Sequence, residues 1–206
     1  IDVGHEVAAY VDTSAGFVVA DASGSVLSVR AGHVTAIGSV DARHPHLASD
    51  PDSPWVGWVE SGDDGAPVFA IFNQATGDRR LVTERTTPDM GTGPGDPDPA
   101  YFYDIDGDTA YMREAGGAVA ENLVTGERSV IDARATDGFD ILDAQDGLIA
   151  FNAADAGTAI GRTRDQALML SGVNTDLGAF SPGAGYYTSD ADQPEVYDAR
   201  TGQRIS

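Results

Sequence analysis

The sequence contains no cysteine and no lysine. Without cysteine the chain can form no disulfide, thiol nucleophile or cysteine-ligated zinc site. Without lysine it cannot form the P-loop that cradles nucleotide phosphates. All 12 basic residues are arginines, and 33 acidic residues outnumber them, which gives a net charge of −21. A surface this acidic repels phosphate backbones and anionic lipids, so we expect no nucleic-acid partner and no membrane insertion.

Long apolar runs and helical patterns are also missing. No run approaches the roughly 18 consecutive apolar residues that a membrane-spanning helix needs. No segment keeps an apolar stripe of period 3.6 over three turns. The first residues, IDVGHEVAAYVD, lack the basic region of a signal peptide. No G-x-S-x-G elbow is present either, which argues against a serine hydrolase domain of that kind.

What the sequence does contain is a repeated line. It reads NQATGDRR at 73–80, NLVTGERS at 122–129 and DARTGQRI at 198–205. An Asn or Asp starts a turn by bonding the backbone that follows it, and Gly supplies a positive φ. Each copy therefore predicts a tight hairpin between two strands. The spacings between the Thr-Gly pairs fit a repeat of about 40 residues.

Short strands separated by turn residues fill each repeat. The runs EVAAYVD, GFVVADA, SVLSVRA and HVTAIGS form the first set, and YFYDIDGDTAYMRE predicts a hairpin around Asp-Gly-Asp. We therefore predict an all-β chain in which four-stranded antiparallel sheets are the blades of a β-propeller. About five blades are visible within a single domain, 1–206. The predicted blade ranges are 3–40, 47–85, 100–135, 139–172 and 177–206.

Two stretches resemble a known class of propeller. EVYDARTGQRIS is similar to the outer strands of WD-repeat-like and Tol-type propeller proteins, in which D-x-x-T-G closes the hairpin of a blade. FSPGAGYYTS, 180–189, resembles their S-P-D-G turn, with Gly183 where Asp is usual. The resemblance implies a propeller, either a closed ring of five blades or part of a ring of six or seven.

Acidic residues supply the candidate metal site. Asp104, Asp106 and Asp108, in the stretch DIDGD, resemble the opening of a calcium loop, because calcium takes hard oxygens at alternating positions. The acids that complete known loops of this type are absent, and a plain strand-turn-strand explains the same residues. We expect no cofactor, with calcium at these aspartates as the alternative. His44 and His46 form a weaker H-x-H pattern for a metal.

The aromatic residues and one long loop are the candidate binding features. We predict that Trp55, Tyr101 and Tyr186 contact a ligand, although packing between blades explains them as well. Trp55 and Trp58 are three apart, so they must face opposite sides of one strand. The loop 85–100 is rich in Pro and Gly and cannot form a strand, which predicts an excursion from one face of the ring, either a loop that faces a ligand or a linker between blades.

These observations favour a non-catalytic binding or scaffold module that presents loops to a protein or glycan partner. The alternative is a carbohydrate-active enzyme that uses carboxylates of the central channel, with Glu60 and Asp104 as the acids to examine. We further expect a bacterial protein that is exported or associated with the cell envelope.

Overall fold

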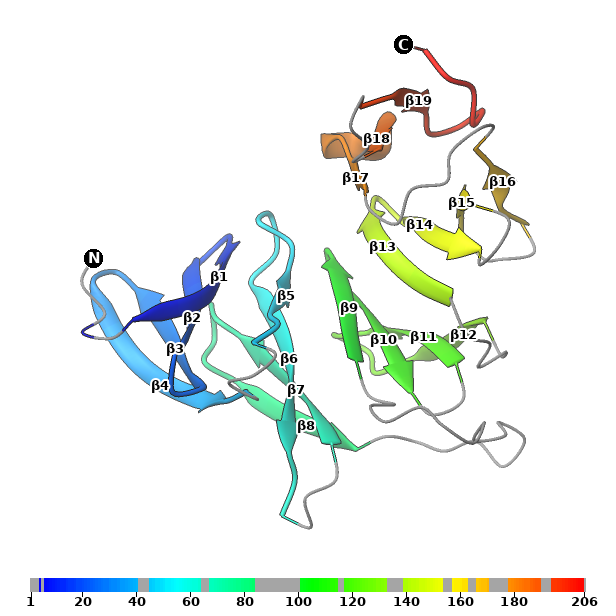
Figure 1. Cartoon of the computed structure of the whole chain (residues 1–206). Helices are drawn as coiled ribbons and strands as arrows, with labels where there is room; N and C mark the ends of the chain where they lie inside the picture. Colours follow the sequence, from blue (N-terminus) through cyan, green and yellow to red (C-terminus); the bar gives the residue numbers. More distant parts are fainter. Residues whose placement is uncertain are drawn as a thin grey trace.

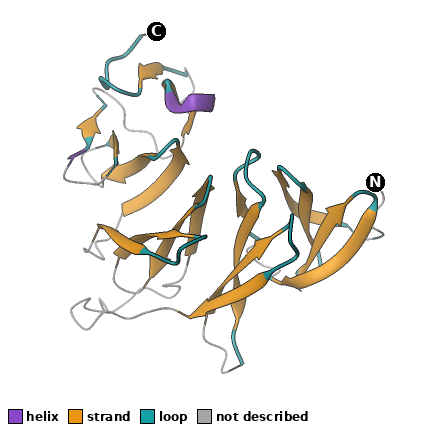
Figure 2. Ribbon diagram, turned by 180° about the vertical axis from the view of Figure 1, so that it is seen from behind, coloured by secondary structure: helices purple, strands orange, loops and turns teal. Residues whose placement is uncertain are grey.

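The computed structural model describes residues 4, 6–40, 45–63, 67–83, 101–114, 117–132, 139–153, 157–162, 166–170, 178–189 and 194–205. Apart from 3₁₀ residues at Gln166 and at Pro182–Ala184 (η3), the regular elements of this part of the chain are β-strands (Figure 2). No helix within these ranges is long and apolar enough to cross a membrane.

The strands form five consecutive antiparallel sheets. The first sheet contains β1 (Val7–Thr13), β2 (Gly16–Asp21), β3 (Ser25–Arg30) and β4 (His33–Ser39). The second contains β5 (Ala48–Ser49), β6 (Trp55–Ser61), β7 (Pro67–Asn73) and β8 (Arg79–Thr83). The third contains β9 (Tyr101–Asp106), β10 (Thr109–Glu114), β11 (Gly117–Asn122) and β12 (Arg128–Asp132). The fourth contains β13 (Phe139–Gln145), β14 (Leu148–Ala153), β15 (Thr158–Gly161) and β16 (Leu168–Met169). The fifth contains β17 (Gly178–Phe180), β18 (Tyr186–Ser189) and β19 (Val196–Asp198).

The sheets follow one another along an open arc (Figure 1). Within each sheet the strands lie in chain order, and the first strands of successive sheets contact one another. The all-β prediction with about five blade-like sheets is confirmed. The ends of the arc do not meet, which excludes a closed five-bladed ring and leaves the other predicted alternative, part of a larger ring. The prediction of four strands in every blade differs in the fifth sheet, whose described residues form three strands plus an isolated bridge between Tyr197 and Arg204.

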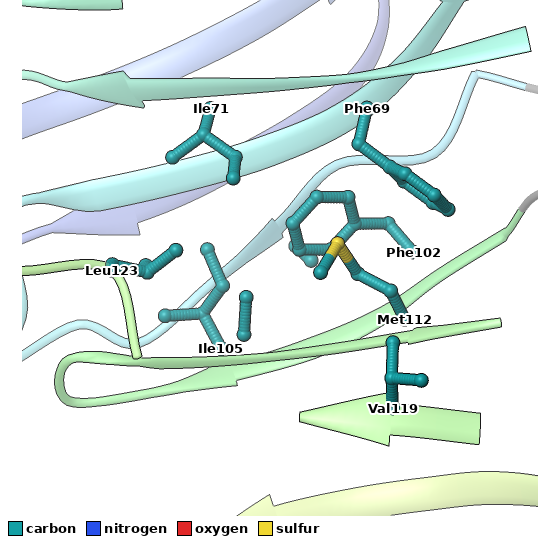
Figure 3. Packing of buried hydrophobic residues seen from close by; sticks show 9 residues of the cluster. Phe69, Ile71, Phe102, Ile105, Met112, Val119 and Leu123 are labelled. Atoms are coloured by element: carbon teal, nitrogen blue, oxygen red, sulfur yellow. The ribbon is translucent and has the colours of Figure 1, made fainter. Parts of the chain in front are cut away.

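A buried apolar cluster lies between each pair of adjacent sheets. Figure 3 shows the second and third sheets, where Phe69 and Ile71 point toward Phe102 and Met112. The rings of Phe69 and Phe102 meet edge to face with centroids 5.8 Å apart. The two sheets approach so closely that a Cβ at Gly57 would lie 2.2 Å from the Phe102 ring. Each sheet thus depends on its neighbours to remove its apolar faces from water.

The two tryptophans serve two different clusters. Trp55 packs against the cluster between the second and third sheets. Trp58 is fully buried in the cluster between the first and second sheets. The prediction that they face opposite sides of β6 is confirmed.

The repeated line forms the same hairpin turn three times. In each copy the side-chain oxygen of the leading Asn or Asp accepts hydrogen bonds from the N–H groups two and three residues later. The leading residues are Asn73, Asn122 and Asp198, with N···O distances of 3.0 and 3.1 Å, 3.0 and 2.8 Å, and 2.9 and 2.8 Å. The glycines Gly77, Gly126 and Gly202 have φ values of +83°, +73° and +67°. The predicted turn mechanism is confirmed in all three copies.

The arginine at the seventh position of each copy pairs with a glutamate of its own sheet. The pairs are Arg79 with Glu60, Arg128 with Glu114, and Arg204 with Glu195. Arg128 and Arg80, which belong to neighbouring sheets, also share Glu121. The repeated Arg therefore joins the outermost strand to the rest of its blade, and at Glu121 the ion pairs cross to the next blade.

Gly126 offers a clean test of the turn. Replacing Gly126 by Ala should lower the free energy of unfolding by about 1–2 kcal/mol, because a non-glycine residue is strained at positive φ. No heavy atom lies within 4 Å of the added Cβ, so backbone strain is isolated from steric clash. Urea denaturation measures the loss. Gly126→Asn is the control and should lose less, since Asn tolerates this conformation. Equal stability of Gly126→Ala and the unaltered chain would contradict the turn mechanism.

Candidate functional site

The predicted calcium residues Asp104 and Asp106 bond the backbone of the next sheet. Asp104 Oδ2 accepts from the N–H of Ala144 on β13, at 2.9 Å. Asp106 Oδ1 and Oδ2 accept from the two N–H groups of the turn 146–147, at 3.0 and 2.6 Å. Because β13 is the first strand of its sheet, one of its edges has no partner strand, and these carboxylates bond N–H groups along it.

The third predicted residue points elsewhere. Asp108 Oδ1 accepts from the indole Nε1 of Trp55 on the second sheet, at 2.9 Å. Within the described ranges no group of three His, Cys, Asp or Glu side chains is placed to hold a metal ion. The stretch DIDGD therefore links three sheets, and its aspartates are not gathered into a cation site.

Asp104 also forms a carboxyl pair with Asp143 of β13. A side-chain hydrogen bond links the two groups. Burial, and after it the charge of Asp143, raise the pKa of Asp104 to about 8. Burial also raises the pKa of Asp143, which accepts from the backbone N–H of Phe180 on the fifth sheet at 2.5 Å. At neutral pH Asp104 is therefore protonated and donates to Asp143, so that one proton joins the third and fourth sheets.

This pair predicts a pH dependence of stability. The folded chain holds a proton on Asp104 that the unfolded chain releases near pH 4, so the contribution of Asp104 to stability falls as the pH rises from about 4 to about 8. The slope for one proton is at most about 1.4 kcal/mol per pH unit. Urea denaturation at several pH values in this window measures it. Asp104→Asn keeps a donor to Asp143 and should show a flatter profile. Identical slopes in the two proteins would contradict the shared proton.

Glu60, the other acid examined for catalysis, is occupied by structural contacts. Its Oε1 accepts from the indole Nε1 of Trp58 at 2.8 Å and from the backbone N–H of Ser39 at 3.0 Å. Its Oε2 pairs with Arg79 at 2.5 Å, and its side chain is 9% exposed. Glu60 thus ties the end of β4 to the second sheet.

The three predicted ligand-binding aromatics do not converge. Tyr101 stacks on His46 with ring centroids 4.8 Å apart and is 43% exposed, at the start of β9. Trp55 and Tyr186 start the second strands of their sheets, at the opposite end of the strands from Tyr101. Burial lowers the pKa of His46, and its predicted metal partner His44 lies outside the described residues. Ligand contact at these aromatics stays a prediction.

A groove of about 600 Å³ opens between the first and second sheets. Its walls include Arg30, His33 and Thr35 from β3, β4 and the end of their hairpin, and Phe72, Gln74 and Arg79 from β7, β8 and their turn. None of the residues that line it is an Asp or Glu, although the chain has 33 acidic residues. The groove is therefore a local exception to the charge of the whole molecule.

A buried glutamine fixes the floor of the groove. Gln74 is 2% exposed, and its Nε2 lies within hydrogen-bond distance of the backbone oxygens of Phe17 and Val29 and of the Ser28 hydroxyl, at 2.9–3.2 Å. Its Oε1 accepts from the Thr13 hydroxyl. The turn of the second sheet is thereby bonded directly to the first sheet, which makes the groove a preformed feature.

The two arginines of the groove differ in their partners. Arg79 is paired with Glu60. Arg30 donates from Nη1 to the backbone oxygens of Gln74 and Ala75, at 3.1 and 2.6 Å, and has no carboxylate partner among the described residues. Arg30 therefore gives the groove a positive charge that is not paired with any carboxylate in the described part of the chain.

Sequence reasoning missed Asp143, Arg30 and Gln74. Asp143 occupies in β13 the position that Asp104 occupies in β9, since each pairs with the third residue of the next strand. An alignment of these two repeats would therefore have indicated Asp143. Gln74 lies inside the repeated line but has no counterpart in the other copies, where Leu123 and Ala199 follow the leading residue. No pattern in the sequence indicates that Arg30 and Gln74 meet.

Comparisons with known proteins agree with the fold. No protein-family model matches the sequence, and a search of curated proteins finds no match. Among solved structures the chain is similar to PorZ, described as an essential bacterial surface component of the type-IX secretion system of Porphyromonas gingivalis, with 13% identity and a TM-score of 0.62. It is also similar to TolB from Acinetobacter baumannii, with 12% identity and a TM-score of 0.51, and to the tricorn protease, with 13% identity and a TM-score of 0.52.

The match covers nearly all of this chain but a smaller part of each neighbour. It covers 98%, 91% and 95% of this chain, and 28%, 49% and 20% of PorZ, TolB and the tricorn protease. The chain thus spans less than two thirds of the length of these neighbours. At such low identities the likeness concerns the fold alone, and these neighbours have propeller-type folds. The chain has the blade-like sheets of a β-propeller.

Proposed function

We propose that the protein is a non-catalytic binding or scaffold module whose recognition site is the groove between the first and second sheets. Its partner is a protein or glycan that presents a negatively charged group. The observation that carries this proposal is the lining of the groove, which contains two arginines and a histidine and no acid in a chain of net charge −21. A preformed concavity with a few convergent polar groups is the usual form of a ligand site.

The position of the acids supports binding over bond chemistry. Glu60 is held by three partners within the protein. Asp104 and Asp143 are hydrogen-bonded to each other, whereas the two carboxyl groups of a glycosidase stand about 5–9 Å apart with room for the sugar or a water. In these positions the carboxyl groups serve to hold the sheets together.

The predicted partner-facing loop 85–100 lies outside the described residues. Its contribution stays part of the proposal. Deleting the loop should weaken binding of a partner that reaches beyond the groove, and should leave binding of small anionic probes unchanged.

Adjacent residues on β4 provide a matched test of the groove. Thr35 lines it, and Val34 points to the other face of the sheet. A hyaluronan oligosaccharide and an acidic peptide serve as anionic probes, measured by thermal shift and calorimetry. A probe at 100 times its Kd should stabilise the protein by about 2.7 kcal/mol. Thr35→Glu should abolish this stabilisation by placing a like charge in the groove, and Val34→Glu should retain it. Equal binding to both variants, or no binding of either probe to the unaltered chain, would contradict the proposal.

The alternative function is a carbohydrate-active enzyme with Glu60 and Asp104 as the predicted acids, and Asp143 is the carboxyl group that the structure places beside Asp104. The binding proposal expects no turnover of chromogenic glycosides or of soluble glycans at any pH from 4 to 8, a range that extends to the pKa of Asp104, which burial raises to about 8. Turnover by the unaltered chain that Asp104→Asn or Asp143→Asn removes, with the fold intact, would establish the enzyme instead.

We infer further that the module works in an exported or envelope-associated bacterial protein. The absence of cysteine is compatible with an oxidising compartment. PorZ, to which the chain is similar in fold, is described as a bacterial surface component, and this supports the inference. Cell fractionation with an antibody to this chain tests the inference, and recovery in the cytoplasmic fraction would contradict it.

A further inference from the structure

β4 is the outermost strand of the first sheet, and its outer edge carries few of the usual protections. It pairs with β3 on one side only, and most of its residues are exposed. Proteins commonly protect such edges with charged residues, proline or very short strands. The strand HVTAIGS is seven residues long and has no proline, arginine or acid. By contrast β8 begins with two arginines, β12 begins with an arginine and ends with an aspartate, and β16 is two residues long.

The backbone groups available at this edge follow from the hairpin register. Ala31 and Gly32 both have positive φ, at +48° and +81°, and Arg30 pairs with His33, so this is a two-residue hairpin turn of type I′. In such a turn the N–H of His33 bonds the carbonyl of Arg30. Bonding directions alternate along an antiparallel strand, so the N–H and C=O of Val34 and Ala36 point to the open edge. A bulge at Ile37 ends this regular stretch.

The groove lies beside the same edge. His33 and Thr35 project from β4 into it. An extended peptide that paired with β4 would alternate its side chains between the two faces of the sheet, so every second side chain would enter the groove. There it would meet the positive charge of Arg30, the His33 side chain and the apolar surface of Phe72.

We propose that an extended peptide segment adds to the outer edge of β4 as a fifth strand of the first sheet and places a carboxylate side chain in the groove. This inference rests on the proposed function, which it deepens by naming a peptide as the partner. Backbone bonds to Val34 and Ala36 supply affinity, and the groove selects the side chain.

The probes are capped eight-residue peptides of alternating Thr and Val with a single central Glu, and the same peptide with Gln or Lys instead. The Glu peptide should bind several-fold more tightly than the Gln peptide, and the Lys peptide should bind least. Ala36→Pro removes one outward N–H and no bond to β3, because proline is tolerated at a strand edge that faces solvent. It should weaken the Glu peptide about tenfold, which is the order expected for one backbone hydrogen bond. Val130→Thr, at an exposed valine on the outer strand β12 of the third sheet, is the control and should bind as the unaltered chain does.

A second test needs no variant of the protein. Methylating alternate backbone nitrogens of the Glu peptide, in its two possible registers, removes the donors of one peptide edge at a time. One register should lose binding and the other should keep it. This comparison remains decisive even if Ala36→Pro disturbs the fold.

The outcomes separate the two proposals. Thr35→Glu can lose binding while Ala36→Pro and both methylated peptides bind fully. That result leaves the groove as the site and overturns strand addition. No binding of the Glu peptide at millimolar concentration, with binding of the hyaluronan oligosaccharide, assigns the groove to a glycan and also overturns it. If the unaltered chain is a dimer and Ala36→Pro is a monomer, the edge of β4 binds a second copy of the chain. That result also overturns the proposal of peptide addition. Failure of every anionic probe removes the proposed function itself.

Discussion

The inner edge of each sheet sets the constraint on which the rest of this structure depends. The first strand of a sheet has a neighbour on one side only, so its other edge presents backbone groups that need partners. In the fourth and fifth sheets the partners are aspartates of the preceding sheet. Asp104 and Asp106 bond β13 and its turn, and Asp143 bonds β17. Each carboxylate fixes the position of the following sheet as well as satisfying a donor, so the sheets are held in register along the arc.

The apolar clusters and these polar bonds have separate tasks. Burial of side chains such as Phe69, Phe102 and Met112 supplies the driving force for stacking, and it is not directional. The carboxylates, the buried Gln74 and the ion pairs at Glu121 specify which groups lie opposite each other. The groove follows from where the polar contacts join the first two sheets and where they do not. The first and second sheets are joined at Gln74, while the outer strand β4 leaves a concave, acid-free surface exposed beside Arg30.

An acidic chain has a particular reason to use its carboxylates in this way. A net charge of −21 destabilises a compact state by repulsion. Bonds to backbone N–H groups, pairing with arginine, and protonation of Asp104 each reduce that repulsion at a specific place. The carboxyl groups that resembled catalytic or calcium-binding residues in the sequence are among those that hold the sheets together.

The fold could be predicted because its signals are local. Asn73, Asn122 and Asp198 form their turns with residues two and three positions away. Apolar and polar residues alternate along the strands, and this pattern is visible within a single repeat. The candidate site could not be predicted, because Arg30 and Gln74 are 44 positions apart in the sequence and meet only when two sheets stack. The role of Asp104 was hidden for the same reason. Its acceptor function depends on the edge of a strand 40 positions later, and the pattern D-x-D-G-D alone does not distinguish a cation from a backbone partner.

Amide hydrogen exchange of Asp106→Ala against the unaltered chain tests the central claim most directly, namely that carboxylates of one sheet hold the free edge of the next. The account predicts faster exchange at the amides of Asp146 and Gly147, which lose their acceptor, and no change at Gly126, whose turn is bonded within its own sheet. Unchanged exchange at 146 and 147 in a folded variant would contradict it.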